Sequence, residues 1–176
     1  MTQANVQLLT FICMKNLLFL ALLCFSSMVF AQSEGVPDVK LKNLAGEAIS
    51  VRDITGKGKI TVISFWATWC SPCKKELSNY AELYDEWQKK YDVQVLAISI
   101  DDARNTAKVK AYVNGVNWPF EVLLDPNEDM KRSMNFQTVP FSMLVDQNGI
   151  VVYRHNSYVE GDEYVMEDKI AALLKK

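Results

Sequence analysis

One stretch constrains the fold of this chain more than any other: an apolar run that ends in two closely spaced cysteines and leads into a long amphipathic segment. Residues 60–67, ITVISFWA, are nearly all apolar and rich in β-branched and aromatic side chains, which is typical of a strand buried on both faces. Residues 93–100, VQVLAISI, have the same character. The order strand, long helix, strand predicts a βαβ unit with parallel strands and a right-handed crossover.

The helix between these strands is predicted from the spacing of its large side chains. They recur at helical intervals after the cysteines, at Leu77, Tyr80, Tyr84, Trp87 and Tyr91. Lysines and acidic residues fill the opposite face, as an amphipathic helix requires. We expect Tyr84, Trp87 and Tyr91 to lie in the core.

The flanking segments extend this unit. Two short alternating runs around Gly46 suggest a hairpin before the first buried strand. A helix is predicted over 103–115, ending near Asn114-Gly115, and a short strand over 120–125. In 125–128, DPNE, Asp125 has the position of an N-cap with proline after it and glutamate at N3, which predicts a helix beginning there.

The last third of the chain predicts a second hairpin and a final helix. Residues 141–146 and 150–155 read as strands joined by Asn148-Gly149, a strong turn signal. Residues 161–176 begin with acidic and end with basic side chains, as suits the helix dipole. The fold class is therefore α/β, with a central mixed β-sheet flanked by helices on both faces.

The first 31 residues have the pattern of a secretory signal. Lys15 precedes the apolar run LLFLALLCF, and Val29 and Ala31 have the −3 and −1 positions of a cut after Ala31. Residues 1–13 carry no charge, so Met14 competes with Met1 as the start. A retained membrane anchor is the alternative, although the apolar core is short for a span of about 20 residues.

Cleavage would leave residues 32–176 as one domain outside the cytoplasm, in the periplasm or an equivalent compartment. A lipid anchor on Cys24 is disfavoured because Leu23 before it is bulky. Without Lys15 the chain has 18 basic and 21 acidic side chains and no basic stripe, which argues against nucleic acid as a partner. We expect a monomer.

Cys70 and Cys73 are then the only cysteines left, because Cys13 and Cys24 fall in the signal. Three interpretations are open: a metal clamp, a structural staple and a redox pair. One close pair is not a disulfide framework. A zinc site needs two more ligands, and His155 is the only histidine. The count therefore favours a redox pair and no metal or cofactor.

The position of Cys70 predicts an activated thiol. It follows a buried strand and opens a helix, where unpaired backbone N–H groups stabilise a thiolate and lower its pKa below about 8.5. Pro72 suits the first helical turn. Cys70 would attack a disulfide in a partner, and the more shielded Cys73 would then attack Cys70 and release the reduced partner.

FWATWCSPCK and TVPFSMLVDQNG resemble the two landmarks of the thioredoxin family, over roughly Val36 to the end. The signal, the early hairpin and the insertion between Ile100 and the proline are similar to the exported TlpA/ResA-type reductants. The resemblance implies a thioredoxin-like fold, with an N-terminal β-hairpin and an insertion between the second core strand and a cis proline.

The resemblance also implies roles for four further positions. Pro140 would be the cis proline facing the cysteines, and Val139 would pair its backbone with an extended client. Trp69 would shield one side of the thiols, next to Pro72. Ser64 replaces the buried aspartate of many thioredoxins. Glu76, one turn after Cys73, would handle the proton of Cys73 with a pKa raised by partial burial; an exposed glutamate is the alternative.

We expect an exported thiol–disulfide oxidoreductase that reduces protein clients, with cytochrome c precursors implied by kinship, and that draws electrons from a membrane thiol donor. The alternatives are a thiol peroxidase, whose usual PxxxTxxC setting is absent, and a copper-binding assembly factor, whose relatives space the cysteines one residue wider.

Three other features are expected to be structural. His155 is interpreted as a surface or satisfied residue. Trp66 is expected to lie either beside the cysteine pair or in the core. Asp101-Asp102 is interpreted as a solvated helix start in preference to a metal site.

Overall fold

The computed structural model describes residues 34–175. The predicted signal at 1–31, with its cleavage after Ala31 and the choice between two start codons, lies outside these residues. Within them, no helix combines the length and the apolar character that a membrane span requires.

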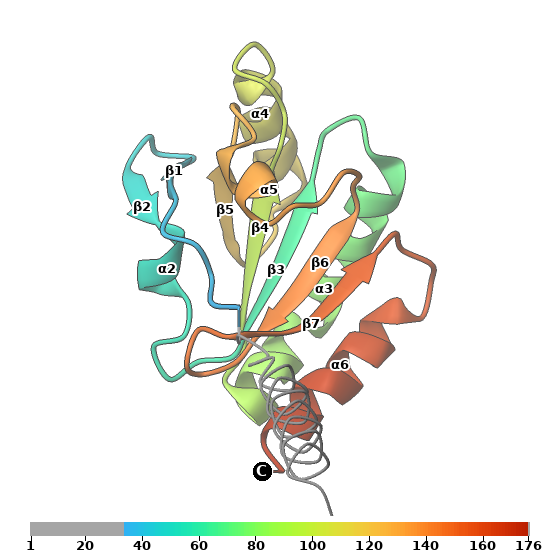
Figure 1. Cartoon of the computed structure of the whole chain (residues 1–176). Coiled ribbons are helices and arrows are strands. Elements are labelled where there is room, and N and C mark those ends of the chain that lie inside the picture. Colours follow the sequence, from blue (N-terminus) through green and yellow to red (C-terminus); the bar gives the residue numbers. More distant parts are fainter. Residues whose placement is uncertain (1–33, 176) are drawn as a thin grey trace, which may run out of the picture. The chain divides into compact units, whose positions relative to one another are not determined.

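A seven-stranded mixed sheet forms the centre of the described chain, in the order β2-β1-β5-β4-β3-β6-β7 (Figure 1). Its strands are β1 (Lys40–Asn43), β2 (Ala48–Ser50), β3 (Thr61–Trp66), β4 (Gln94–Ser99), β5 (Glu121–Leu124), β6 (Phe141–Val145) and β7 (Val151–Asn156). Strands β3, β4 and β5 run parallel, whereas β6 pairs antiparallel with β3 and with β7. The predicted mixed sheet, with its early β1–β2 hairpin, is confirmed.

Five helices flank the sheet in the described part: α2 (Val51–Ile54), α3 (Ser71–Tyr91), α4 (Thr106–Val116), α5 (Asp129–Ser133) and α6 (Asp162–Leu173). All six residues of β3 are buried, so both faces of this strand are covered. Because side chains alternate along a strand, Ser64 and Trp66 share one face and Phe65 lies on the other. Trp66 packs against Tyr112 of α4, and Phe65 against Phe136, which follows α5.

Two predicted helix boundaries are wrong. The helix predicted over 103–115 begins later, at Thr106, whereas its end at Val116, capped by Asn117 with a left-handed φ of 51°, lies near the predicted one. The helix predicted to begin after Asp125 begins at Asp129, because Glu128 has a left-handed φ of 57° and cannot continue a helix backwards. Asp125 still caps it: its carboxylate accepts hydrogen bonds from the amides of Asp129 and Lys131, at 2.7 and 3.0 Å.

Candidate active site

The two cysteines lie where β3 delivers the chain to the start of α3. Cys70 is the N-cap of α3, and its sulfur accepts a hydrogen bond from the amide of Cys73 at 3.3 Å. The two residues are joined as a disulfide, with their Cα atoms 5.4 Å apart. Pro72 lies in the first turn of α3, where a backbone N–H has no partner within the helix, so its absence in proline costs no hydrogen bond. This arrangement places the Cys73 amide, a backbone donor at the start of the helix, against the Cys70 sulfur.

The two sulfurs differ slightly in access. Cys70 is 4% exposed and Cys73 is fully buried, which is the expected order, although Cys70 is itself well covered in this disulfide form. Trp69 is 68% exposed and stands beside the pair in sequence. Trp66, for which two places were open, is fully buried and belongs to the core.

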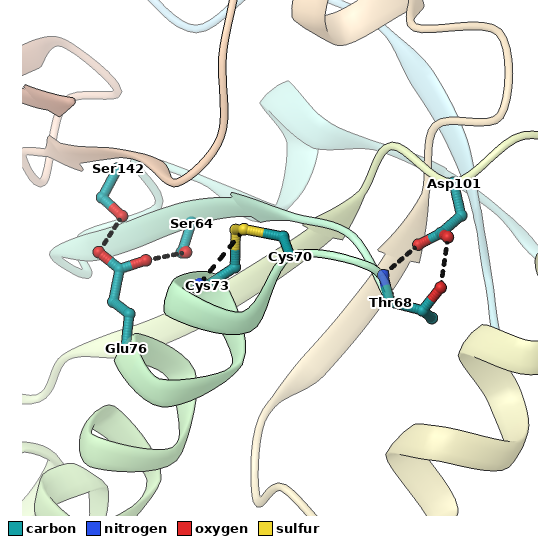
Figure 2. The surroundings of a disulfide bond; sticks show 7 residues. All are labelled: Ser64, Thr68, Cys70, Cys73, Glu76, Asp101 and Ser142. Carbon is teal, nitrogen blue, oxygen red and sulfur yellow. Dashed lines mark hydrogen bonds between the residues drawn. A yellow bond between two sulfur atoms is a disulfide. The ribbon is translucent and has the colours of Figure 1, made fainter. Parts of the chain in front are cut away.

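Glu76 is completely buried on the face of α3 that turns towards the sheet. Its two carboxylate oxygens accept three hydrogen bonds: from Ser64 at 2.8 Å, from Ser142 at 2.8 Å and from Tyr80 at 3.1 Å. Figure 2 shows the carboxyl group between the two serines, one helical turn along from the cysteines. Burial was expected to be partial and is complete.

This environment sets the proton affinity of Glu76. Loss of hydration on burial raises its pKa from the ordinary 4.5 to about 7, and the hydrogen bonds from Ser64, Ser142 and Tyr80 limit the rise. A carboxyl group with this pKa exchanges a proton near neutral pH. The same burial, together with the nearby carboxylate, raises the pKa of Tyr80.

Sequence reasoning missed the second serine and the tyrosine of this cluster. Ser142 comes from β6, 66 positions after Glu76. The available signal was the pattern of β3 and β6, in which one serine interrupts each apolar strand, because a buried hydroxyl needs a partner. The strand register places Ser64 opposite Ser142, so both hydroxyls reach the same carboxyl group.

The peptide bond between Val139 and Pro140 is cis. Phe141, the next residue, is paired with Phe65 of β3 in the antiparallel register. Pro140 therefore lies beside the end of β3 from which the cysteine loop leaves. The carbonyl oxygen of Pro140 accepts a hydrogen bond from the amide of Ser157 at 2.9 Å, which connects the cis-proline segment to the end of β7.

Asp101 is not part of a solvated helix start, and that prediction is wrong for this residue. It is 4% exposed, and its carboxylate accepts hydrogen bonds from Thr68 and Ser99. Its neighbour Asp102 does lie at the surface, where it binds the amides of Arg104 and Asn105. The two adjacent aspartates thus have different environments.

His155 is satisfied by a carboxylate: its Nε2 lies 3.0 Å from Oδ2 of Asp162 at the start of α6. Among residues 34–175 there is no group of three or more histidine, cysteine or acidic side chains that could hold a metal ion. The cysteine pair therefore has no further ligand grouped with it in this part of the chain.

Comparison with known proteins shows which family the chain resembles in sequence. The model of the AhpC/TSA family matches residues 33–154. The thioredoxin-like protein YneN of Bacillus subtilis is 30% identical over 140 residues, which cover 79% of this chain and 78% of YneN. The thiol-disulfide oxidoreductase ResA of Bacillus thuringiensis is 33% identical over 116 residues, covering 66% of this chain and 64% of ResA, just under two thirds.

Solved structures give the same picture of the fold. An uncharacterized thioredoxin-like protein from Porphyromonas gingivalis superposes with a TM-score of 0.71 at 42% identity, over 80% of this chain and 92% of that one. StoA from Bacillus subtilis superposes with a TM-score of 0.59 at 26% identity, over 73% and 96% of the two chains.

Proposed function

Because this chain belongs to the AhpC/TSA family of thioredoxin-like proteins, as a TlpA/ResA-like thiol–disulfide oxidoreductase, we propose that it reduces disulfides in other proteins through Cys70 and Cys73. The observation that carries the proposal is the place of Cys70 at the N-cap of α3. In that position the Cys70 sulfur accepts a hydrogen bond from the amide of Cys73. A thiolate in this place is stabilised by the free donors and the dipole of the helix.

The reaction takes two exchange steps. The Cys70 thiolate attacks one sulfur of a client disulfide, forming a mixed disulfide and releasing the first client sulfur as a thiolate. The Cys73 thiolate then attacks the Cys70 sulfur, which forms the Cys70–Cys73 disulfide and releases the second client thiolate. Two electrons pass from the enzyme dithiol to the client. A dithiol donor, which we propose to be a membrane protein, restores the enzyme by the reverse exchange.

Glu76 is proposed to accept the proton that Cys73 must lose before it can attack. It lies three residues after Cys73 on the same face of α3, and its pKa of about 7 lets it be unprotonated in part of the molecules at neutral pH. The serine and tyrosine donors hold the carboxyl group in one orientation.

The client segment is proposed to bind beside the cis proline. The backbone of Val139 would pair with an extended peptide, as in strand addition, and the exposed ring of Trp69 would cover one side of the client sulfur. Pro72 would shape the surface next to Cys70.

Export and the client class are further parts of this proposal. The signal pattern of residues 1–31 supports a place outside the cytoplasm, with membrane tethering if the segment is retained. Kinship with TlpA/ResA-type reductants supports cytochrome c precursors as clients, through reduction of their haem-attachment cysteines. Cell fractionation with an antibody against residues 32–176 tests the location.

The central test is insulin reduction with a dithiol donor. The wild-type protein is expected to precipitate insulin B chains at a rate that Cys70→Ser abolishes. Cys73→Ser is expected to accumulate a mixed disulfide that thiols release. Full activity of Cys70→Ser would rule out this assignment of roles.

The same protein samples separate the two alternatives. Stoichiometric binding of Cu(I) at physiological thiol concentrations, without insulin reduction, would indicate a copper-binding assembly factor. Rapid consumption of hydroperoxide that survives Cys73→Ser would indicate a thiol peroxidase.

A further inference from the structure

The loop that presents Cys70 is a tight turn with its own anchor. The amide of Cys70 donates to the carbonyl oxygen of Ala67 at 3.0 Å, which closes a four-residue turn over residues 67–70. Thr68 is the second residue of this turn. Whatever fixes Thr68 therefore fixes where the chain enters α3 and where the Cys70 sulfur lies.

Asp101 binds Thr68 at two points. Its Oδ2 accepts the backbone amide of Thr68 at 2.8 Å, and its Oδ1 accepts the hydroxyl at 2.6 Å. Such paired hydrogen bonds to a carboxylate are short and set an orientation as well as a distance. Figure 2 shows this contact on the side of the cysteine pair opposite Glu76.

Asp101 is itself held in place from the sheet. Oδ2 also accepts the hydroxyl of Ser99 at 2.9 Å, and that hydroxyl oxygen accepts the Asp101 amide at 3.1 Å. Ser99 is fully buried at the end of β4, and Asp101 is 4% exposed. The contact thus ties the cysteine turn to the end of β4 through Asp101, which lies 33 positions after Thr68.

We propose that Asp101 is a positioning residue of the redox pair, which holds the turn 67–70 through Thr68 so that the Cys70 sulfur stays aligned with the Cys73 amide at the start of α3. Without the anchor, the turn is free to shift and the thiolate loses part of its stabilisation. Support of this kind around a reactive group commonly decides how precisely it is held. The inference rests on the proposed function in one respect, the role of Cys70 as the attacking thiol.

The replacement of Asp101 by asparagine distinguishes position from charge. The asparagine carbonyl oxygen can accept the Thr68 amide and the Ser99 hydroxyl. Its NH₂ group can donate to the Thr68 hydroxyl oxygen, because a hydroxyl both donates and accepts. Asp101→Asn therefore keeps the anchor and removes the negative charge, whereas Asp101→Ala removes both.

The experiment is to measure the alkylation rate of Cys70 by iodoacetamide at pH 7 in the reduced full-length protein, together with the equilibrium of the pair with glutathione. We expect iodoacetamide to label Cys70 in Asp101→Ala at least about threefold more slowly than in wild type. We also expect the glutathione equilibrium to shift towards the Cys70–Cys73 disulfide, since the Cys70 thiolate is less stabilised. Asp101→Asn is expected to remain close to wild type. Asp102→Ala, the same change at the adjacent exposed carboxylate, is the matched control and is expected to change neither readout.

If Asp101→Ala does not fold, Thr68→Val serves in its place. It removes the hydroxyl contact at 2.6 Å and keeps the amide contact at 2.8 Å, so a smaller effect in the same direction is expected, with recovery in Thr68→Ser. Equal labelling of wild type and Asp101→Ala, or equal slowing by Asp101→Asn and Asp101→Ala, would overturn the inference. A wild-type protein that labels no faster than free cysteine and fails to reduce insulin would instead overturn the proposed function.

Discussion

The hydroxyl of Ser64 donates a 2.8 Å hydrogen bond to Oε2 of Glu76, and this bond joins the central strand β3 to helix α3 just after the cysteines. Ser142 and Tyr80 complete the contacts of the carboxyl group. Burial and hydrogen bonding act in opposite directions on its pKa, and burial is the larger effect. Glu76 is therefore a carboxyl group that holds its proton at pH values where an exposed glutamate has lost it.

Glu76 makes the stability of the protein depend on pH between 4.5 and 7. In this range the folded protein still binds the proton that the unfolded chain has released, so the free energy of unfolding falls as the pH rises. The full difference corresponds to about 3 kcal/mol. We expect Glu76→Gln to flatten this part of the profile in urea titrations at pH 4.5, 6 and 8. Glu86→Gln, on the exposed face of the same helix, should leave the slope intact, and an unchanged slope in Glu76→Gln would contradict the assignment.

Removal of a serine donor should raise the pKa of Glu76 further. Both serine hydroxyls stabilise the ionised carboxylate, so Ser64→Ala or Ser142→Ala is expected to raise the pKa by roughly one unit. The measurement is an NMR titration of the ¹³C-labelled carboxyl group. Ser133→Ala, whose hydroxyl binds a backbone carbonyl in α5, serves as the comparison and should not move the titration. A lower pKa in either variant would show that these hydroxyls do not donate to Glu76.

Two glycines in the loop before β3 should respond differently to the same substitution. Gly56 and Gly58 both have a left-handed backbone, with φ of 70° and 83°. A methyl group on Gly58 meets open space, so Gly58→Ala should cost only the conformational strain, about 1 kcal/mol. A methyl group on Gly56 would overlap the backbone of Gly149, so Gly56→Ala should cost about 1–3 kcal/mol more. Equal melting temperatures for the two variants would show that this close approach is absent.

The contact between α3 and the start of α6 should depend on one hydroxyl. Tyr158 donates to Oε2 of Glu163 at 2.7 Å and accepts a hydrogen bond from the side-chain amide of Asn79. Tyr158→Phe leaves the buried side chains of Asn79 and Glu163 without the tyrosine hydroxyl as a partner. It should lower the free energy of unfolding by about 1–3 kcal/mol. Tyr164→Phe makes the same change on the exposed ring that follows Glu163 in the sequence, and denaturant unfolding should find it neutral. Equal stabilities of the two variants would argue against the network.

The predictable parts of the molecule were those in which the local pattern alone decides the structure. The uniform apolar run of β3 and the helical spacing after Cys73 required burial of particular faces, and both elements formed as expected. The start of α5 was missed because the left-handed backbone of Glu128 has no signal in its residue type. Asp101 was misjudged because its partner Thr68 is distant in sequence, and no local pattern indicates such a pairing.

Glu76 shows the same limit within the candidate site. Its spacing from Cys73 predicted the face of the helix on which it lies, and the resemblance to TlpA/ResA-type proteins implied its role. One of its hydrogen-bond donors is Ser142, a residue of β6 that is distant in sequence. The role of the group in proton transfer stays a prediction.

Ser142 lies two positions after the cis proline, on the strand that continues from Val139. The short segment 139–142 thus carries both the backbone proposed to bind the incoming peptide and the Ser142 hydroxyl that donates to Glu76, the group proposed to take a proton. If a bound client shifts this segment, we expect the hydrogen bond from Ser142 to Glu76 to change with it. Client binding and the pKa of Glu76 would then be linked through the position of one strand, β6.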